Sequence, residues 1–178
     1  MSNSMPPAAS YAALESQHRN GANWFYWIAV LSLITAVFQI AGGGLNFLVG
    51  LGVTLFVAAV AGAADQQVAP ETAMVIKAIA IGVCGIVSAI FAGLGFFARR
   101  GHIWAYVVGM LLYALDGLIF VGLAFLDPGL WINAAFHGFV LLCLFNGCKA
   151  ARALNSAIRE TVEPDFGAGL EPGLEPLQ

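Results

Sequence analysis

Two ionisable side chains, Asp116 and His137, stand inside long apolar runs of this sequence, where such groups are rare. A strong turn signal, Asp127-Pro128-Gly129, separates the two runs. Asp116 lies twelve residues before Pro128, and His137 lies nine residues after it. On two antiparallel helices that rise 1.5 Å per residue, these side chains would lie about 18 Å and about 13.5 Å from the turn. We therefore expect them to meet near the middle of a hydrocarbon core about 30 Å thick.

Two more polar residues fall on the same faces of these expected helices. Tyr113 shares a face with Asp116 at three-residue spacing, and Asn133 shares one with His137 at four-residue spacing. The candidate intramembrane polar cluster is Tyr113, Asp116, Asn133 and His137. It fits either a proton-relay or solute-binding pair, or a buried hydrogen bond that fixes helix packing. A charged side chain at the bilayer centre costs at least about 2.5–3.5 kcal/mol, so in both cases we expect Asp116 to face protein.

Composition indicates that lipid surrounds the elements that hold this cluster. Of the 178 residues, 60% are hydrophobic and only 10% are charged, and the mean hydropathy is +0.86. A soluble domain is typically about 25% charged, and a chain this short cannot bury so much apolar surface in one core. The net charge of −3 gives no basic excess of the kind that nucleic acid attracts. We expect an integral membrane protein with no nucleic-acid partner.

Five apolar segments follow one another between two polar ends. They cover about 23–41, 46–63, 74–98, 103–125 and 130–148. A spanning helix needs about 20 residues, which the last three segments provide easily. The predicted fold class is all-α: a polytopic transmembrane helix bundle over residues 23–148, after a polar N-terminal tail at 1–22.

The first two segments are short, and only Ala-Gly-Gly-Gly-Leu at 41–45 separates them. A glycine run breaks a helix and permits a tight reversal, so we predict two short helices in a hairpin. The alternative is four spans plus a re-entrant or interfacial helix. In the polar end 149–178, residues 149–159 are predicted to extend the last helix. A Pro/Gly-rich tail follows at 164–178.

Basic residues give the expected orientation. The two basic clusters are Arg99 and Arg100, between the third and fourth segments, and Lys149, Arg152 and Arg159, after the fifth. The opposite connections, at 64–72 and 126–129, contain no Lys or Arg. The positive-inside rule therefore puts the C-terminus in the cytoplasm. Five spans would put the N-terminus outside, whereas four would put it inside, in agreement with Arg19.

Small residues at four-residue spacing mark two faces on which helix backbones can approach closely. The first helix-packing face is Gly50, Thr54, Ala58 and Gly62, and the second is Gly85, Ala89 and Gly93. The pattern predicts helix contacts but does not say whether the neighbour belongs to this chain or to another.

The sequence contains no motif for catalysis or for a cofactor. HExxH, a Gly-rich phosphate loop and a Ser-His-Asp arrangement are all missing. Haem between helices would need two histidines at matching depth, and only His137 is in mid-span. The three cysteines, Cys84, Cys143 and Cys148, lie in or beside apolar runs and are interpreted as small buried hydrophobes. We expect no enzyme activity, no cofactor and no metal.

The segment Asn23-Trp-Phe-Tyr-Trp-Ile-Ala29, with Gly42-Gly43-Gly44 and Val49-Gly-Leu-Gly52, resembles the opening of an uncharacterised family of small bacterial multi-span membrane proteins. The resemblance implies a bacterial cytoplasmic (inner) membrane and brings no activity with it.

Two functions fit these patterns. The first is a non-catalytic accessory or scaffold subunit that packs against other membrane protein subunits or against itself. The alternative is a small-solute or proton-coupled transporter centred on Asp116 and His137. A polar cavity reaching one face would favour the transporter, and a tightly packed bundle would favour the subunit.

Overall fold

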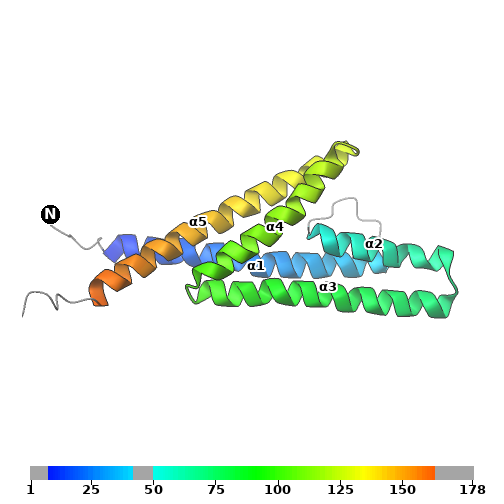
Figure 1. Cartoon of the computed structure of the whole chain (residues 1–178), viewed down its shortest axis with the longest axis horizontal. Coiled ribbons are helices and arrows are strands. Elements are labelled where there is room, and N and C mark those ends of the chain that lie inside the picture. Colours follow the sequence, from blue (N-terminus) through cyan, green and yellow to red (C-terminus); the bar gives the residue numbers. More distant parts are fainter. Residues whose placement is uncertain (1–7, 42–49, 163–178) are drawn as a thin grey trace, which may run out of the picture.

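The computed structural model describes residues 8–41 and 50–162, and these ranges are almost entirely helical. The elements are α1 (Ala8–Ile40), α2 (Gly52–Gln67), α3 (Pro70–Arg99), α4 (Ile103–Ala124), the short 3-10 helix η1 (Pro128–Leu130) and α5 (Trp131–Val162). The predicted all-α bundle of five apolar helical segments is confirmed (Figure 1).

Among these described helices, α1, α3, α4 and α5 are long and apolar enough to cross a membrane. The apolar part of α2 is shorter, covering Gly52–Ala64. With 16 residues in all, α2 is about 24 Å long at 1.5 Å per residue. That is less than a hydrocarbon core about 30 Å thick. The chain is thus a membrane protein with four candidate spans and one shorter apolar helix.

The predicted hairpin of the first two segments is wrong, because α2 runs beside α1 in the same direction (Figure 1). Near the start of α2, the Leu51 N–H donates to Ser32 Oγ at 2.9 Å. Further along, a Cβ on Gly62 would lie 3.2 Å from the Gln39 carbonyl oxygen. The contacts advance along both helices together, so α1 and α2 are parallel. The glycine run behind the hairpin prediction lies mostly in 42–49, outside the described residues.

The first and the last helix both extend beyond the apolar segments that the hydropathy pattern marks. Residues 8–22 of the predicted polar N-terminal tail are helical and form the start of α1. This stretch is polar but rich in helix-forming Ala, Leu, Glu and Gln, and its residue Ala22 is fully buried. At the other end, α5 continues to Val162, as predicted for 149–159. Residues 1–7 and the predicted tail at 164–178 lie outside the described ranges.

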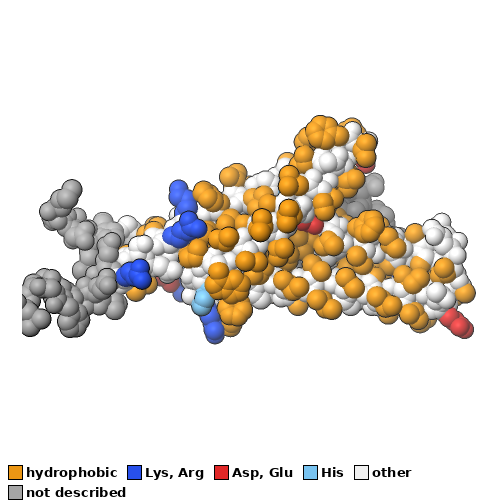
Figure 2. Space-filling view, in the orientation of Figure 1, with side chains coloured by type: hydrophobic (Ala, Val, Ile, Leu, Met, Phe, Trp, Pro, Cys, Tyr) orange, Lys and Arg blue, Asp and Glu red, His pale blue; other side chains and the backbone are white. Residues whose placement is uncertain are grey.

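The start of α1, the α3–α4 connection and the end of α5 lie together at one end of the molecule (Figure 1). The backbones of α1 and α5 are in close contact there, since a Cβ on Gly21 would lie 2.5 Å from the Gly147 Cα. Phe25 and Tyr106 fill the core beside this crossing, and both are fully buried. On the outside, hydrophobic side chains spread over the helices, as expected for surfaces in contact with lipid (Figure 2).

The two small-residue faces have different surroundings. On the first face, Thr54 and Ala58 are buried, and a Cβ on Gly50 would lie 2.8 Å from Thr35 Oγ1. On the second face, Ala89 is exposed and no atom lies within 4 Å of a Cβ built on Gly85 or Gly93. Within the described part of the chain, no helix covers this second face, so the expected close contact is not made inside one molecule.

Candidate functional site

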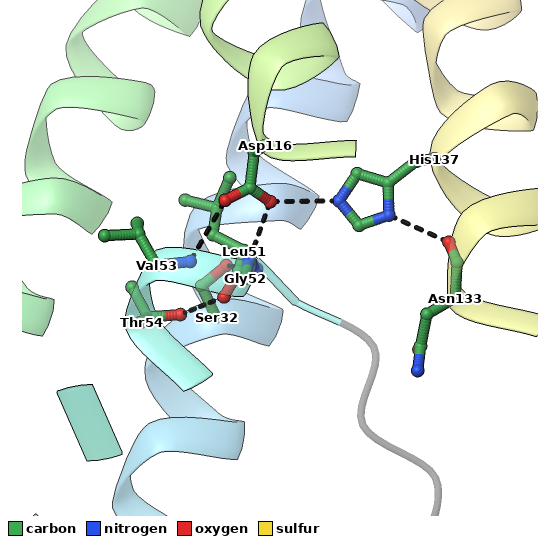
Figure 3. Close-up of polar contacts among 8 residues, drawn as sticks. All are labelled: Ser32, Leu51, Gly52, Val53, Thr54, Asp116, Asn133 and His137. Atoms are coloured by element: carbon green, nitrogen blue, oxygen red, sulfur yellow. Dashed lines mark hydrogen bonds and ion pairs between the residues drawn. The ribbon is translucent and has the colours of Figure 1, made fainter. Parts of the chain in front are cut away.

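Asp116 and His137 meet in the interior between α4 and α5. His137 Nε2 lies 3.1 Å from Asp116 Oδ2. The two side chains are only 6% and 3% exposed, respectively. Their contact across the turn at η1 is the one that the residue spacing predicts, and Asp116 faces protein (Figure 3).

Asp116 also caps the N-terminus of α2. Its Oδ2 accepts the Gly52 N–H at 2.7 Å, and its Oδ1 accepts the Val53 N–H at 3.0 Å. The first N–H groups of a helix have no partner within the helix, and a negative charge is stabilised there. The residue before α2, Leu51, provides no side-chain cap of its own. A carboxylate from α4 therefore replaces the usual local N-cap.

Ser32 of α1 binds the same helix end from the other side. Its Oγ accepts the Leu51 N–H at 2.9 Å, and Thr54 Oγ1 donates to the Leu51 carbonyl at 2.7 Å. A Cβ on Gly52 would lie 2.9 Å from the Phe120 ring and 3.3 Å from Asp116 Oδ1, so glycine permits the close approach. The N-terminus of α2 is thus fixed to both α1 and α4 (Figure 3).

The donors and acceptors around His137 require one proton between His137 and Asp116. His137 Nδ1 lies 2.8 Å from the Asn133 carbonyl oxygen, which can only accept, so Nδ1 carries a proton. At 3.1 Å, Nε2 and Oδ2 need a second proton between them, on one atom or the other. Either way, the pair has no net charge.

Aromatic rings of α4 cover the imidazole of His137. Tyr113 stacks on it with a centroid distance of 4.5 Å and an interplanar angle of 14°, and Phe120 lies at 4.9 Å. A Cβ on Gly117 would lie 3.1 Å from His137 Cβ, so this glycine lets α5 approach α4. These contacts leave the imidazole little freedom to turn.

The structure brings three of the four predicted cluster side chains together: Tyr113, Asp116 and His137. The fourth, Asn133, contributes its backbone carbonyl, and its side chain points away from the pair (Figure 3). The sequence reasoning missed Ser32 and the backbone N–H groups of Leu51, Gly52 and Val53. Two features of the sequence could have indicated these contacts. They are the Ser32 hydroxyl within the first apolar segment and the closely spaced glycines at 50 and 52.

A second polar cluster, which the sequence pattern does not predict, joins α1, α3 and α4 at the end of the molecule where α1 begins. Tyr106 Oη donates to the His18 carbonyl at 2.8 Å and lies 3.2 Å from His18 Nδ1. His18 Nε2 donates to the Arg99 carbonyl at 3.4 Å. His18 is only 6% exposed, so this cluster fixes α1 against α3 and α4.

Three surface cavities in the described part of the chain lie beside the N-terminal half of α1, with volumes of about 440, 520 and 510 Å³. None of the three is lined by Asp116 or His137. No group of three or more His, Cys, Asp or Glu side chains within residues 8–41 and 50–162 is placed to hold a metal ion.

Comparison with known proteins finds no matching family model, no matching curated protein and no matching solved structure. The resemblance of the opening segment to small bacterial membrane proteins therefore stays a prediction.

Proposed function

We propose that this chain is a non-catalytic accessory or scaffold subunit of a larger membrane assembly, in a bacterial cytoplasmic membrane. The observation that carries the proposal is the bonding of Asp116. Both of its oxygens accept backbone N–H groups of α2, and one also contacts His137. A carboxyl group whose oxygens are both occupied by hydrogen bonds within the protein supports a role in helix packing rather than in binding a cargo.

The uncovered face of α3 supports an interaction with another protein. Gly85, Ala89 and Gly93 form a smooth strip on which a second helix could lie with close backbone contact. In lipid, such packing contacts are a main source of helix association, because lipid tails are as apolar as leucine.

The distribution of bases supports an orientation with the start of α1 and the end of α5 in the cytoplasm. Lys and Arg side chains gather at the end where α1 begins and α5 ends (Figure 2). The other end carries Asp127 and Glu71 but no base in the connections at 68–69 and 125–127. The four-span arrangement brings Arg19 into agreement with the positive-inside rule.

Photo-crosslinking in native membranes tests the proposal. A photoreactive residue at Ala89 should give a discrete protein adduct, either with another subunit or with a second copy. The matched control is Leu111, which is 60% exposed on α4 and has Val107 and Leu115 as its neighbours at four-residue spacing. We expect lipid adducts alone from position 111. Lipid adducts alone from position 89 as well would contradict a partner on this face.

One observation favours the alternative function, a small-solute or proton-coupled transporter centred on Asp116 and His137. The pair shares a proton inside the membrane region, and paired acids and histidines are used in proton relays. Purified protein in liposomes with a pH-sensitive dye inside tests this function. A transporter would show flux that Asp116→Asn abolishes, because an amide cannot titrate. Absence of flux under a potential and a pH gradient would support the accessory role.

A further inference from the structure

A cavity at the basic end of the molecule has the character of a site for an anionic amphiphile. Its volume is about 510 Å³, and three separate parts of the chain line it. The lining includes Tyr11 and His18 from α1, Arg99 and Arg100 from the C-terminal end of α3, and Asn155 and Ile158 from α5. The cavity therefore exists only when all three parts are packed together.

Within residues 8–41 and 50–162, the two arginines that line the cavity have no acidic partner. Glu15 is the acid among the lining residues, and it pairs with Arg19 at 2.7 Å. Among the described residues, no carboxylate forms an ion pair with Arg99 or Arg100. As far as the described part of the chain shows, the cavity thus presents two positive charges without an acidic partner, which favours an anion.

The backbone carbonyl groups at the C-terminal end of α3 do not create a competing site for a cation. Arg100 N and His102 N donate to the Phe97 carbonyl, and Gly101 N donates to the Ala98 carbonyl. The Arg99 carbonyl accepts from His18 Nε2. These carbonyl groups already accept hydrogen bonds, so the guanidinium groups are the ones available to bind a ligand.

Aromatic rings next to the arginines indicate that the anion carries an apolar part. Arg100 Cζ lies 4.1 Å from the centre of the Phe96 ring, and Arg99 Cζ lies 6.0 Å from that of Tyr26. Phe96 and Trp104 are 46% and 49% exposed, so apolar surface begins directly beside the charges. Such a boundary between base and ring matches the boundary between headgroup and acyl chain.

We propose that this cavity binds an anionic phospholipid, with its phosphate against Arg99 and Arg100 and its acyl chains along the exposed rings of α3 and α4. Arginine matches phosphate geometrically, and basic pockets between membrane helices bind phosphate-bearing headgroups. The same charges could bind free phosphate, so the test separates the lipid from a soluble anion. This site is independent of whether the chain is a subunit or a transporter.

Native mass spectrometry of the full-length protein in detergent, titrated with defined lipids, tests the proposal. Phosphatidylglycerol and phosphatidylcholine share a phosphodiester but differ in net charge. We expect the wild-type protein to prefer phosphatidylglycerol about tenfold or more, and the double variant Arg99→Gln/Arg100→Gln to lose that preference. The control Lys149→Gln/Arg152→Gln removes the same charge from residues that do not line the cavity, and it should keep the preference.

A second variant fills the cavity without changing its charge. Ala12 is exposed and lines both this cavity and the neighbouring one of about 520 Å³. Ala12→Trp should therefore weaken phosphatidylglycerol binding while the circular dichroism spectrum stays unchanged. Equal loss in the Lys149/Arg152 control, or no preference for phosphatidylglycerol in the wild type, would overturn the proposal. Displacement of the lipid by equimolar glycerol 3-phosphate would overturn the lipid as ligand in favour of a soluble phosphate.

Discussion

The carboxylate of Asp116 and the backbone N–H of Gly52 are joined at 2.7 Å across 64 residues of sequence. This bond makes the position of α2 depend on α4, although α2 lies beside α1. A helix end inside lipid has no water to satisfy its N–H groups, so the cap from α4 is a requirement rather than an accessory contact.

Replacement of Asp116 should therefore destabilise the protein in a graded order. Asp116→Asn keeps one acceptor oxygen and can donate to His137, so we expect a loss of about 1–2 kcal/mol. Asp116→Leu removes every bond to α2 and leaves His137 buried without its partner, at a cost of about 3–5 kcal/mol. Thermal unfolding in detergent, followed by circular dichroism, measures both. Equal stability of the two variants would contradict a capping role.

Ser32→Ala should loosen the same helix end from the α1 side. The Leu51 N–H would lose its acceptor in a buried position, which costs about 1–3 kcal/mol. Hydrogen exchange should accelerate at residues 51–55 and stay unchanged in α5. The control is Ser16→Ala, because Ser16 is exposed on the N-terminal half of α1. A similar acceleration in the control would show that the effect is not local.

Gly21→Ala should force α1 and α5 apart. A Cβ at position 21 would lie 2.5 Å from the Gly147 Cα, and backbone atoms cannot move aside as a flexible side chain can. Overpacking of this kind costs about 1–3 kcal/mol. The matched control is Gly138→Ala on α5, where nothing lies within 4 Å. There the better helix propensity of alanine should leave stability unchanged or raise it by up to about 1 kcal/mol.

Cysteine labelling should report one net membrane crossing between residues 12 and 71 and another between residues 71 and 100. Cysteines introduced at Ala12 and Arg100 should react from the same side of the membrane, and one at Glu71 from the opposite side. All three positions are exposed, and the unmodified protein gives the background from its native cysteines. Reaction of positions 12 and 100 from opposite sides would contradict the parallel arrangement of α1 and α2.

The contact between Asp116 and His137 was predictable because it depends only on the rise per residue of a helix and on the position of a turn that the sequence marks clearly. Both quantities are local, so counting residues from Pro128 is enough. The cap on α2 was not predictable in this way. It links Asp116 to a helix 64 residues earlier, and hydropathy does not encode how two helices lie beside each other.

The parallel course of α1 and α2 escaped prediction because a glycine run permits many paths as well as a reversal. The helical stretch 8–22 escaped it for a different reason. Its side chains are polar, so it has no apolar signal, yet His18 and Ala22 are buried against neighbouring helices. Tertiary packing, not hydropathy, determines where α1 begins.

The capping of α2 by α4 also sets an order for biosynthesis. During translation, Gly52 leaves the ribosome 64 residues before Asp116. At roughly 5–20 residues per second, α2 exists for about 3–13 s without the group that satisfies its N-terminus. We expect it to wait at the bilayer surface, where water can serve its N–H groups, and to enter only once α4 and α5 are inserted. The second helix to be synthesised would thus be the last to reach its place.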